Sequence, residues 1–118
     1  MAKKKRNEAT PALAALQKAG AQVIVHEYAH DPRAQSYGNE AAEQLGLAAA
    51  RVFKTLIVQA DGSLAVGVVP VAGLLDLKAM AAALGAKKAV LADLVAAQRS
   101  TGYVVGGISP FGQKRKLA

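Results

Sequence analysis

The stretch VFKTLIVQADGSLAVGVV, residues 52–69, decides the fold expected of this chain. Val52 to Ala60 is rich in β-branched and apolar residues, and Leu64 to Val69 repeats that character. Between the two runs, Asp61-Gly62-Ser63 is a turn signal, because glycine adopts the positive φ angles that tight hairpin turns need. The stretch therefore predicts a β-hairpin that Pro70 ends.

Helix and strand signals follow on both sides of this hairpin. Thr10, Asn39, Asp76 and Asp93 are suitable N-caps, and glycines stand where several helices should end. The predicted helices run from Pro11 towards Gly20 and over residues 40–45, 77–84 and 94–97, and the predicted further strands cover residues 22–28, 89–91 and 103–108. Because helices and strands do not alternate regularly, we expect a mixed α/β fold rather than repeated βαβ units.

Composition restricts the class of protein. The chain has 118 residues, 53% of them hydrophobic, which suits one domain with a single core. It has no Cys, so disulfides, thiolate metal sites and a cysteine nucleophile are excluded. The longest apolar stretch, Leu64 to Leu75, is interrupted by Gly and Pro and is too short for a membrane span, which takes about 20 residues. We expect a cytoplasmic protein without a membrane partner.

The positive charge lies at the two ends. The net charge is +7, yet residues 7 to 113 hold eight basic and eight acidic side chains. Lys3 to Arg6 form the core of a basic arm over residues 1–9, which we expect to be flexible, and Lys114, Arg115 and Lys116 form the other cluster. Basic ends suit a polyanion such as nucleic acid, although short basic tails also serve only for solubility.

Lys54 is the most unusual single residue. The two-residue period of a strand places it on the same face as Val52, Leu56 and Val58. An ammonium on an apolar face either lies in a cleft, where it can donate hydrogen bonds to a carbonyl or phosphate, or extends along the core to reach water. Position alone leaves both interpretations open.

A glycine-rich run, Gln98 to Pro110, is the second candidate for a site. Gly106 and Gly107 let a backbone approach a ligand closely, and Ser109 follows them. Tyr28 and Tyr37 flank a loop, where each is either a pocket residue or an ordinary half-buried aromatic. His26 and His30 lack an evident third ligand, so no metal site is predicted, and no catalytic triad, phosphate loop or dinucleotide motif is present.

Several segments in order resemble the YbaK/EbsC group of trans-editing proteins, the Cys-tRNA(Pro) deacylases, which share a fold with the editing domain of bacterial prolyl-tRNA synthetases. The resemblance covers residues 10 to 118 as one domain and rests on the following segments: Tyr28-Ala29-His30-Asp31-Pro32, Tyr37-Gly38-Asn39-Glu40, Val52-Phe53-Lys54-Thr55-Leu56, Val69-Pro70-Val71-Ala72-Gly73, Leu75-Asp76-Leu77-Lys78, Ala83-Leu84-Gly85-Ala86-Lys87-Lys88 and Gln98 to Pro110. It implies a barrel-like mixed sheet with surrounding helices, no cofactor, and tRNA as partner, with prolyl-tRNA synthetase as a second partner.

The resemblance also implies roles for residues. Lys54 matches the essential lysine that holds the substrate, and Gly106 matches the glycine whose backbone approaches the aminoacyl group. Tyr28, Tyr37, Gly107 and Ser109 fall in the substrate pocket, and residues 114–116 are the expected tRNA contacts. In cysteine-specific members the substrate's own thiol attacks its carbonyl, so the protein need only position the ester and stabilise developing charge.

The chain departs from the family pattern at its C-terminal end. Family members continue past the point that corresponds to Ala118 with further strands and a pocket Ser and Asp, which implies that the present chain is truncated. The leading hypothesis is deacylation of Cys-tRNA(Pro), and the variant within the class is deacylation of Ala-tRNA(Pro). The alternatives are a non-catalytic tRNA- or synthetase-binding module, and a remnant that acts only with a partner that supplies the missing strands. The sequence leaves the oligomeric state open.

Overall fold

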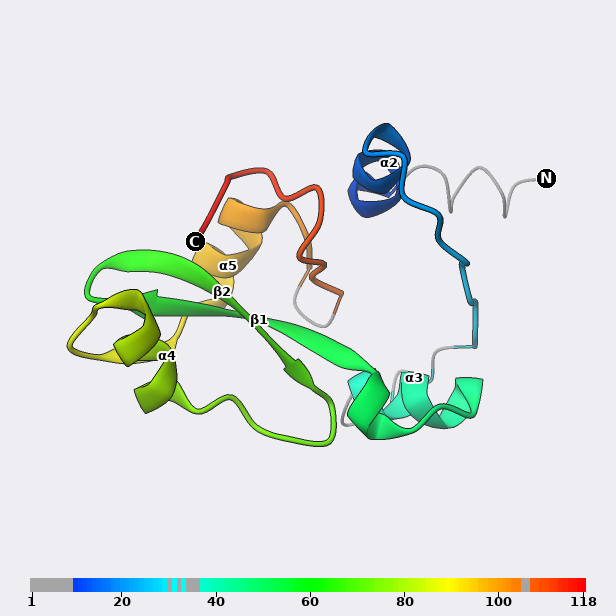
Figure 1. The fold of residues 1–118 in the computed structure, drawn as a ribbon, viewed down its shortest axis with the longest axis horizontal. Helices are drawn as coiled ribbons and strands as arrows, with labels where there is room; N and C mark the ends of the chain where they lie inside the picture. Colours follow the sequence, from blue (N-terminus) through cyan, green and yellow to red (C-terminus); the bar gives the residue numbers. More distant parts are fainter. Residues whose placement is uncertain (1–9, 30, 32, 34–36, 105–106) are drawn as a thin grey trace.

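The hairpin predicted from residues 52–69 is the centre of the fold. The computed structural model describes residues 10–29, 31, 33, 37–104 and 107–118. Strand β1 (Phe53–Ala60) pairs antiparallel with β2 (Ser63–Pro70), in a register that runs from Phe53 opposite Pro70 to Ala60 opposite Ser63. The short strand β3 (Ala89–Leu91) pairs antiparallel with the other edge of β1, so the strand order is β2-β1-β3 (Figure 1). The mixed α/β class is confirmed, but the described strands form an open antiparallel sheet rather than a closed barrel.

The two-residue turn of the hairpin also fixes the position of β3. Asp61 and Gly62 have φ angles of 50° and 97°, as a tight hairpin turn requires. The Asp61 carboxylate accepts hydrogen bonds from the backbone N–H groups of Lys87 (2.7 Å) and Lys88 (3.1 Å). These bonds hold the residues that lead into β3 against the hairpin turn.

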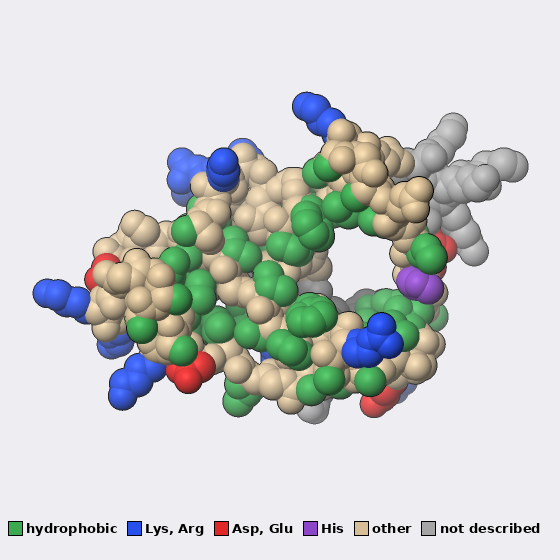
Figure 2. All heavy atoms as spheres, viewed as in Figure 1, with side chains coloured by type: hydrophobic (Ala, Val, Ile, Leu, Met, Phe, Trp, Pro, Cys, Tyr) green, Lys and Arg blue, Asp and Glu red, His purple; other side chains and the backbone are tan. Residues whose placement is uncertain are grey.

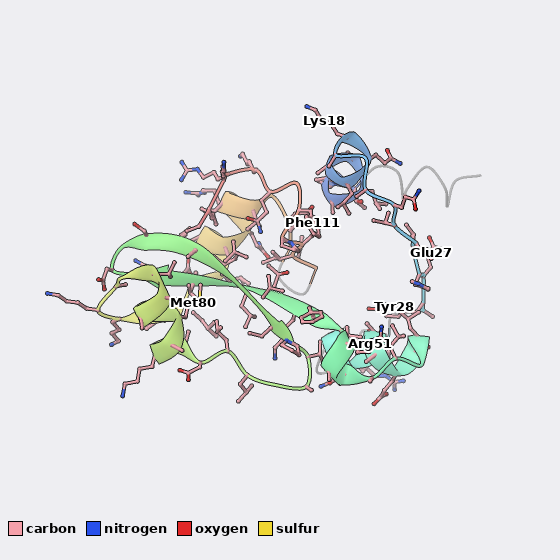
Figure 3. All side chains as sticks on the ribbon, in the orientation of Figure 1. Lys18, Glu27, Tyr28, Arg51, Met80 and Phe111 are labelled. Carbon is pink, nitrogen blue, oxygen red and sulfur yellow. The ribbon has the colours of Figure 1, made fainter. Side chains whose placement is uncertain are left out.

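Helix α4 (Leu77–Leu84) packs on one face of the sheet. Its N-cap Asp76 accepts from the Ala79 N–H, and Gly85 ends it with a φ of 70°, both as predicted. Small side chains bring the helix close to the strands, and the core cluster consists of Ala60, Ala81 and Ala89 with Leu84 and Ala86 against it. Figure 3 shows Met80 on the side of α4 that faces the hairpin.

Helix α5 (Leu94–Thr101) lies on the other side of the hairpin from α4 (Figure 1). Asp93 caps it as predicted, but the helix extends four residues past the predicted end at Ala97. The reason is that its polar last turn is buried: Ser100 and Thr101 are almost inaccessible, and the Thr101 hydroxyl donates to the Ala97 carbonyl at 2.8 Å. Gly102, with a φ of 80°, ends the helix.

The N-terminal region combines a confirmed helix with a wrong strand prediction. Helix α2 (Pro11–Lys18) begins at the predicted cap, where Thr10 accepts from the Leu13 N–H at 3.2 Å. The strand predicted over residues 22–28 does not form; residues 21–29 have no regular structure and most of their side chains are exposed. A strand needs a partner for its N–H and C=O groups, and no described strand pairs with this segment.

Helix α3 (Tyr37–Leu45) begins three residues earlier than predicted and is followed by the 3₁₀ helix η1 (Ala49–Arg51). The early start packs Gly38 directly against Val71, where a Cβ atom would collide with the valine side chain. Because the backbone of α3 approaches Val71 so closely, its first turn is held against the end of the hairpin.

The strand predicted over residues 103–108 is also wrong. Of this stretch the structure describes residues 103, 104, 107 and 108, and none of them is in a strand. Within the described residues, no helix combines the length and apolar character that crossing a membrane would require.

Candidate functional site

Lys54 lies on the sheet face that α4 covers. It pairs with Val69 in the hairpin, and the alternation of β1 places it with Leu56 and Val58. On this face a Cβ atom on Gly67, which pairs with Leu56, would stand 3.1 Å from Leu75 and 3.7 Å from Met80. This face is therefore apolar, and Leu75 and Met80 cover it closely as far as Leu56, the neighbour of Lys54 on the same face.

The Lys54 side chain is half-buried there. Among the described residues it forms no hydrogen bond or ion pair, so its ammonium is not used by the fold. A cation held on an apolar surface interacts more strongly with an incoming carbonyl or phosphate than one in bulk water, because less solvent screens it. This is the feature expected of a substrate-holding lysine.

The end of the hairpin beside Lys54 meets α3 and η1. The Val71 N–H donates to the Val52 carbonyl at 2.7 Å, and the Ala72 N–H donates to the Ala49 carbonyl at 3.2 Å. The contact of Gly38 with Val71 then holds the first turn of α3 at the same end. Tyr37 directly precedes Gly38, so its backbone lies near the Lys54 end of the hairpin, while its side chain lies outside the described part.

Tyr28 reaches this region along the connecting segment. Its side chain is half-buried, unlike the exposed residues before it. Three residues later, the Asp31 N–H donates to the Glu40 carboxylate of α3 at 2.6 Å, which ties the segment to that helix. Figure 3 shows Tyr28 at the α3 end of the segment, and Figure 2 shows an opening between α2, residues 19–29 and α3.

The glycine-rich run forms a loop whose turns are built from local hydrogen bonds. Gly106 lies outside the described residues. The Gly107 N–H donates to the Val104 carbonyl at 2.9 Å, and the Ser109 hydroxyl accepts from the Phe111 N–H at 3.1 Å. Ser109 therefore serves a turn, although its hydroxyl proton remains free to donate. Among the described residues, no hydrogen bond joins Lys54 to this loop.

Two residues of the loop that the sequence did not single out fix its shape. The Tyr103 hydroxyl donates to the Phe111 carbonyl at 2.7 Å, across the base of the loop. Gly112 has a φ of 64°, and a Cβ atom there would overlap the Pro11 carbonyl. The loop thus contacts the start of α2 through a backbone approach that only glycine permits. The glycine itself was the available signal, but its partner is about a hundred residues away in the chain.

No metal chemistry is evident in this region. Among the residues described, no three His, Cys, Asp or Glu side chains lie close enough together to hold an ion. His26 is exposed, and His30 lies outside the described part. The groups that the structure does offer are a lysine ammonium, backbone N–H groups, hydroxyls and basic side chains.

Comparison with known proteins defines the class of this chain. Residues 31–118 match the family model of the aminoacyl-tRNA editing domain, and the chain belongs to that family. Over 118 residues it is 35% identical to a protein of Enterococcus faecalis provisionally named Cys-tRNA(Pro)/Cys-tRNA(Cys) deacylase EbsC, and the match covers 99% of this chain and 71% of that one.

Solved structures support the same fold. One, provisionally named a trans-editing enzyme for prolyl-tRNA synthetase, superposes with a TM-score of 0.78 at 23% identity, over 91% of this chain and 66% of that one. Another, of a hypothetical protein, gives 0.75 at 24% identity over 92% of this chain and 71% of its own length. The chain thus spans about two thirds of these structures.

Proposed function

We propose that this chain is an aminoacyl-tRNA deacylase that hydrolyses the ester of Cys-tRNA(Pro). The observation that carries the proposal is Lys54, a half-buried lysine on the apolar face of β1 whose ammonium forms no hydrogen bond or ion pair with the described residues. Membership of the editing-domain family supports the reaction class, and the 35% identical relative supports cysteine as the amino acid.

In the proposed mechanism the protein holds the aminoacyl ester in place, and the attacking group is the thiol of the substrate itself. Lys54 donates hydrogen bonds to the ester carbonyl or the neighbouring phosphate, and the backbone of Gly106 and Gly107 approaches the aminoacyl group. The substrate thiolate attacks the carbonyl carbon, the bond to the ribose oxygen breaks, and that oxygen leaves as a hydroxyl with the proton lost by the thiol. The product of this attack is a cyclic thioester of cysteine, which water then hydrolyses to free cysteine. Tyr28, Tyr37 and Ser109 bound the pocket in this proposal.

The test is the rate of deacylation of Cys-tRNA(Pro). Lys54→Ala should slow hydrolysis by about a hundred-fold or more, which is the usual effect of removing one preorganised donor. Lys78→Ala is the matched control, since Lys78 is an exposed lysine of α4 away from the hairpin end. Equal rates for wild type and Lys54→Ala would remove the basis of the proposal.

Specificity is tested with Ala-tRNA(Pro) under the same conditions. Alanine has no thiol, so substrate-assisted attack predicts no hydrolysis above the spontaneous rate. Comparable rates on both tRNAs would instead identify an Ala-tRNA(Pro) deacylase with a water nucleophile.

The proposal includes prolyl-tRNA synthetase as a partner and the cytoplasm as the place of action, because the mischarged tRNA is made there. Co-elution with purified synthetase in gel filtration, with and without tRNA, is the measurement. Independent elution in both cases would limit the partner to tRNA.

A further inference from the structure

The segment after the glycine-rich loop folds back onto the end of α5. The Lys114 N–H donates to the Thr101 carbonyl at 2.9 Å, and the Arg115 N–H donates to the Ser100 carbonyl at 2.9 Å. Residues 114–116 therefore run beside the last turn of α5, which carries the exposed side chain of Arg99. We call the exposed residues Arg99, Lys114, Arg115 and Lys116 the α5 cation surface. Figure 2 shows Lys and Arg side chains gathered over α5 and the C-terminal segment.

The charge of this surface is not balanced locally. Residues 94–118 contain these four basic residues and no acidic one, whereas residues 10–93 contain seven of each sign. Among the described residues, no ion pair involves any of the four side chains. Cations near a helix C-terminus do favour the helix dipole, but that effect is confined to the last turn and does not account for Lys116.

The other pair of neighbouring basic residues has a different setting. Lys87 and Lys88 lie beside the Asp61 carboxylate, which accepts a hydrogen bond from each of their backbone N–H groups. A negative charge at that position reduces the local positive potential, because opposite charges at short range largely cancel. This pair is therefore a natural control for the α5 cation surface.

An exposed aromatic ring precedes the surface closely in the chain, in the loop that lies between α5 and α2 (Figure 3). Phe111 is 49% exposed although it is a large apolar residue, and it lies three positions before Lys114, within about 10 Å along the chain. Its backbone is held at both polar groups, since its carbonyl accepts from Tyr103 and its N–H donates to Ser109. Cations on an anchored backbone near an exposed ring are a combination that binds phosphates and stacks an unpaired base.

We propose that the α5 cation surface and Phe111 together dock RNA near a single-stranded end, with the cations on the phosphates and the ring on a base. The identification of this RNA as tRNA rests on the proposed function. The proposal adds Arg99 and Phe111 to the basic cluster at residues 114–116 and places all of them on one RNA-binding surface.

The test measures binding of uncharged tRNA to the full chain by fluorescence anisotropy between about 50 and 200 mM salt. Arg99→Gln with Arg115→Gln should weaken binding about ten-fold at low salt and reduce the slope of log affinity against log salt by about 1 to 2. Lys87→Gln with Lys88→Gln, which removes the same charge, should leave the slope unchanged. An equal loss in both double variants, or no binding by the wild type, would overturn the proposal.

Phe111→Leu tests the stacking part, since leucine keeps the apolar volume and both backbone bonds but has no ring. It should weaken binding of intact tRNA about ten-fold and leave binding of tRNA trimmed of its single-stranded 3′ end unchanged. Equal affinity of wild type for vesicles of anionic lipid at the same salt would assign the surface to a membrane instead and refute RNA docking. Circular dichroism melting of each variant checks that it is folded.

Uncharged tRNA carries no ester, so these measurements do not depend on catalysis. If Lys54→Ala hydrolyses Cys-tRNA(Pro) like wild type while the surface variants lose RNA, the proposed function fails and the docking surface stands. The reverse pattern would refute the docking surface alone.

Discussion

The two ends of the β1–β2 hairpin differ in what their residues do. At the turn end, Ala60 is buried in a cluster with Ala81 and Ala89, and Asp61 ties the turn to the start of β3. At the other end, Phe53 is 59% exposed, Val68 is 48% exposed, and Lys54 has no partner among the described residues. At the turn end the side chains are buried or hydrogen-bonded within the fold, while at the open end apolar side chains and the Lys54 ammonium remain available to a ligand. The contrast in packing indicates that stability is concentrated at the turn end, and the proposed function assigns substrate contact to the open end.

The largest expected effect on stability comes from Val58→Ala. Val58 is fully buried in the middle of β1, so truncation loses apolar burial and leaves a cavity, at a cost of about 2 to 3 kcal/mol in the free energy of unfolding. Val68→Ala, the control on the exposed part of β2, should cost less than about 1 kcal/mol. Urea denaturation followed by circular dichroism measures both, and similar losses would show that the two ends are equally packed.

A smaller effect is expected from Asp61→Ala at the turn. The change removes the acceptor of two backbone N–H groups and places alanine at a positive φ, which should lower the free energy of unfolding by about 1 to 2 kcal/mol. Asp61→Asn should lose less, because asparagine tolerates this conformation and its side-chain oxygen still accepts. Deacylation by the folded fraction should stay at the wild-type rate in both variants. A rate that falls in parallel with stability would contradict the separation of the two ends.

The same contrast explains how much the sequence predicted. The hairpin, α4 with Asp76 and Gly85, and the Thr10 cap depend on local patterns, and the structure has all of them. The strands predicted over residues 22–28 and 103–108 depended on a partner that no local pattern specifies, and the described residues of both stretches are not in strands.

In the candidate site, too, the local features were predictable from the sequence and the long-range contacts were not. The position of Lys54 follows from the period of a strand, and the structure keeps it on the apolar face. The contact of Gly38 with Val71 and that of Gly112 with Pro11 join segments far apart in the chain, so the sequence showed the glycines but not their partners. The return of residues 114–116 to α5 likewise depends on the loop that precedes them, whose shape is set by the bond from Tyr103 to Phe111.

The smallest expected effect on stability, and the sharpest separation from activity, comes from Lys54→Met. Methionine keeps the stem that covers the apolar face but removes the ammonium, which forms no hydrogen bond or ion pair with the described residues. The free energy of unfolding should change by less than about 1 kcal/mol, while deacylation falls as in Lys54→Ala, the pattern of a residue kept for function rather than for stability. Lys78→Met on the exposed side of α4 should change neither quantity. A loss of stability in Lys54→Met as large as that in Val58→Ala would mean that the lysine holds the open end together, and the substrate role would then have no separate support from this geometry.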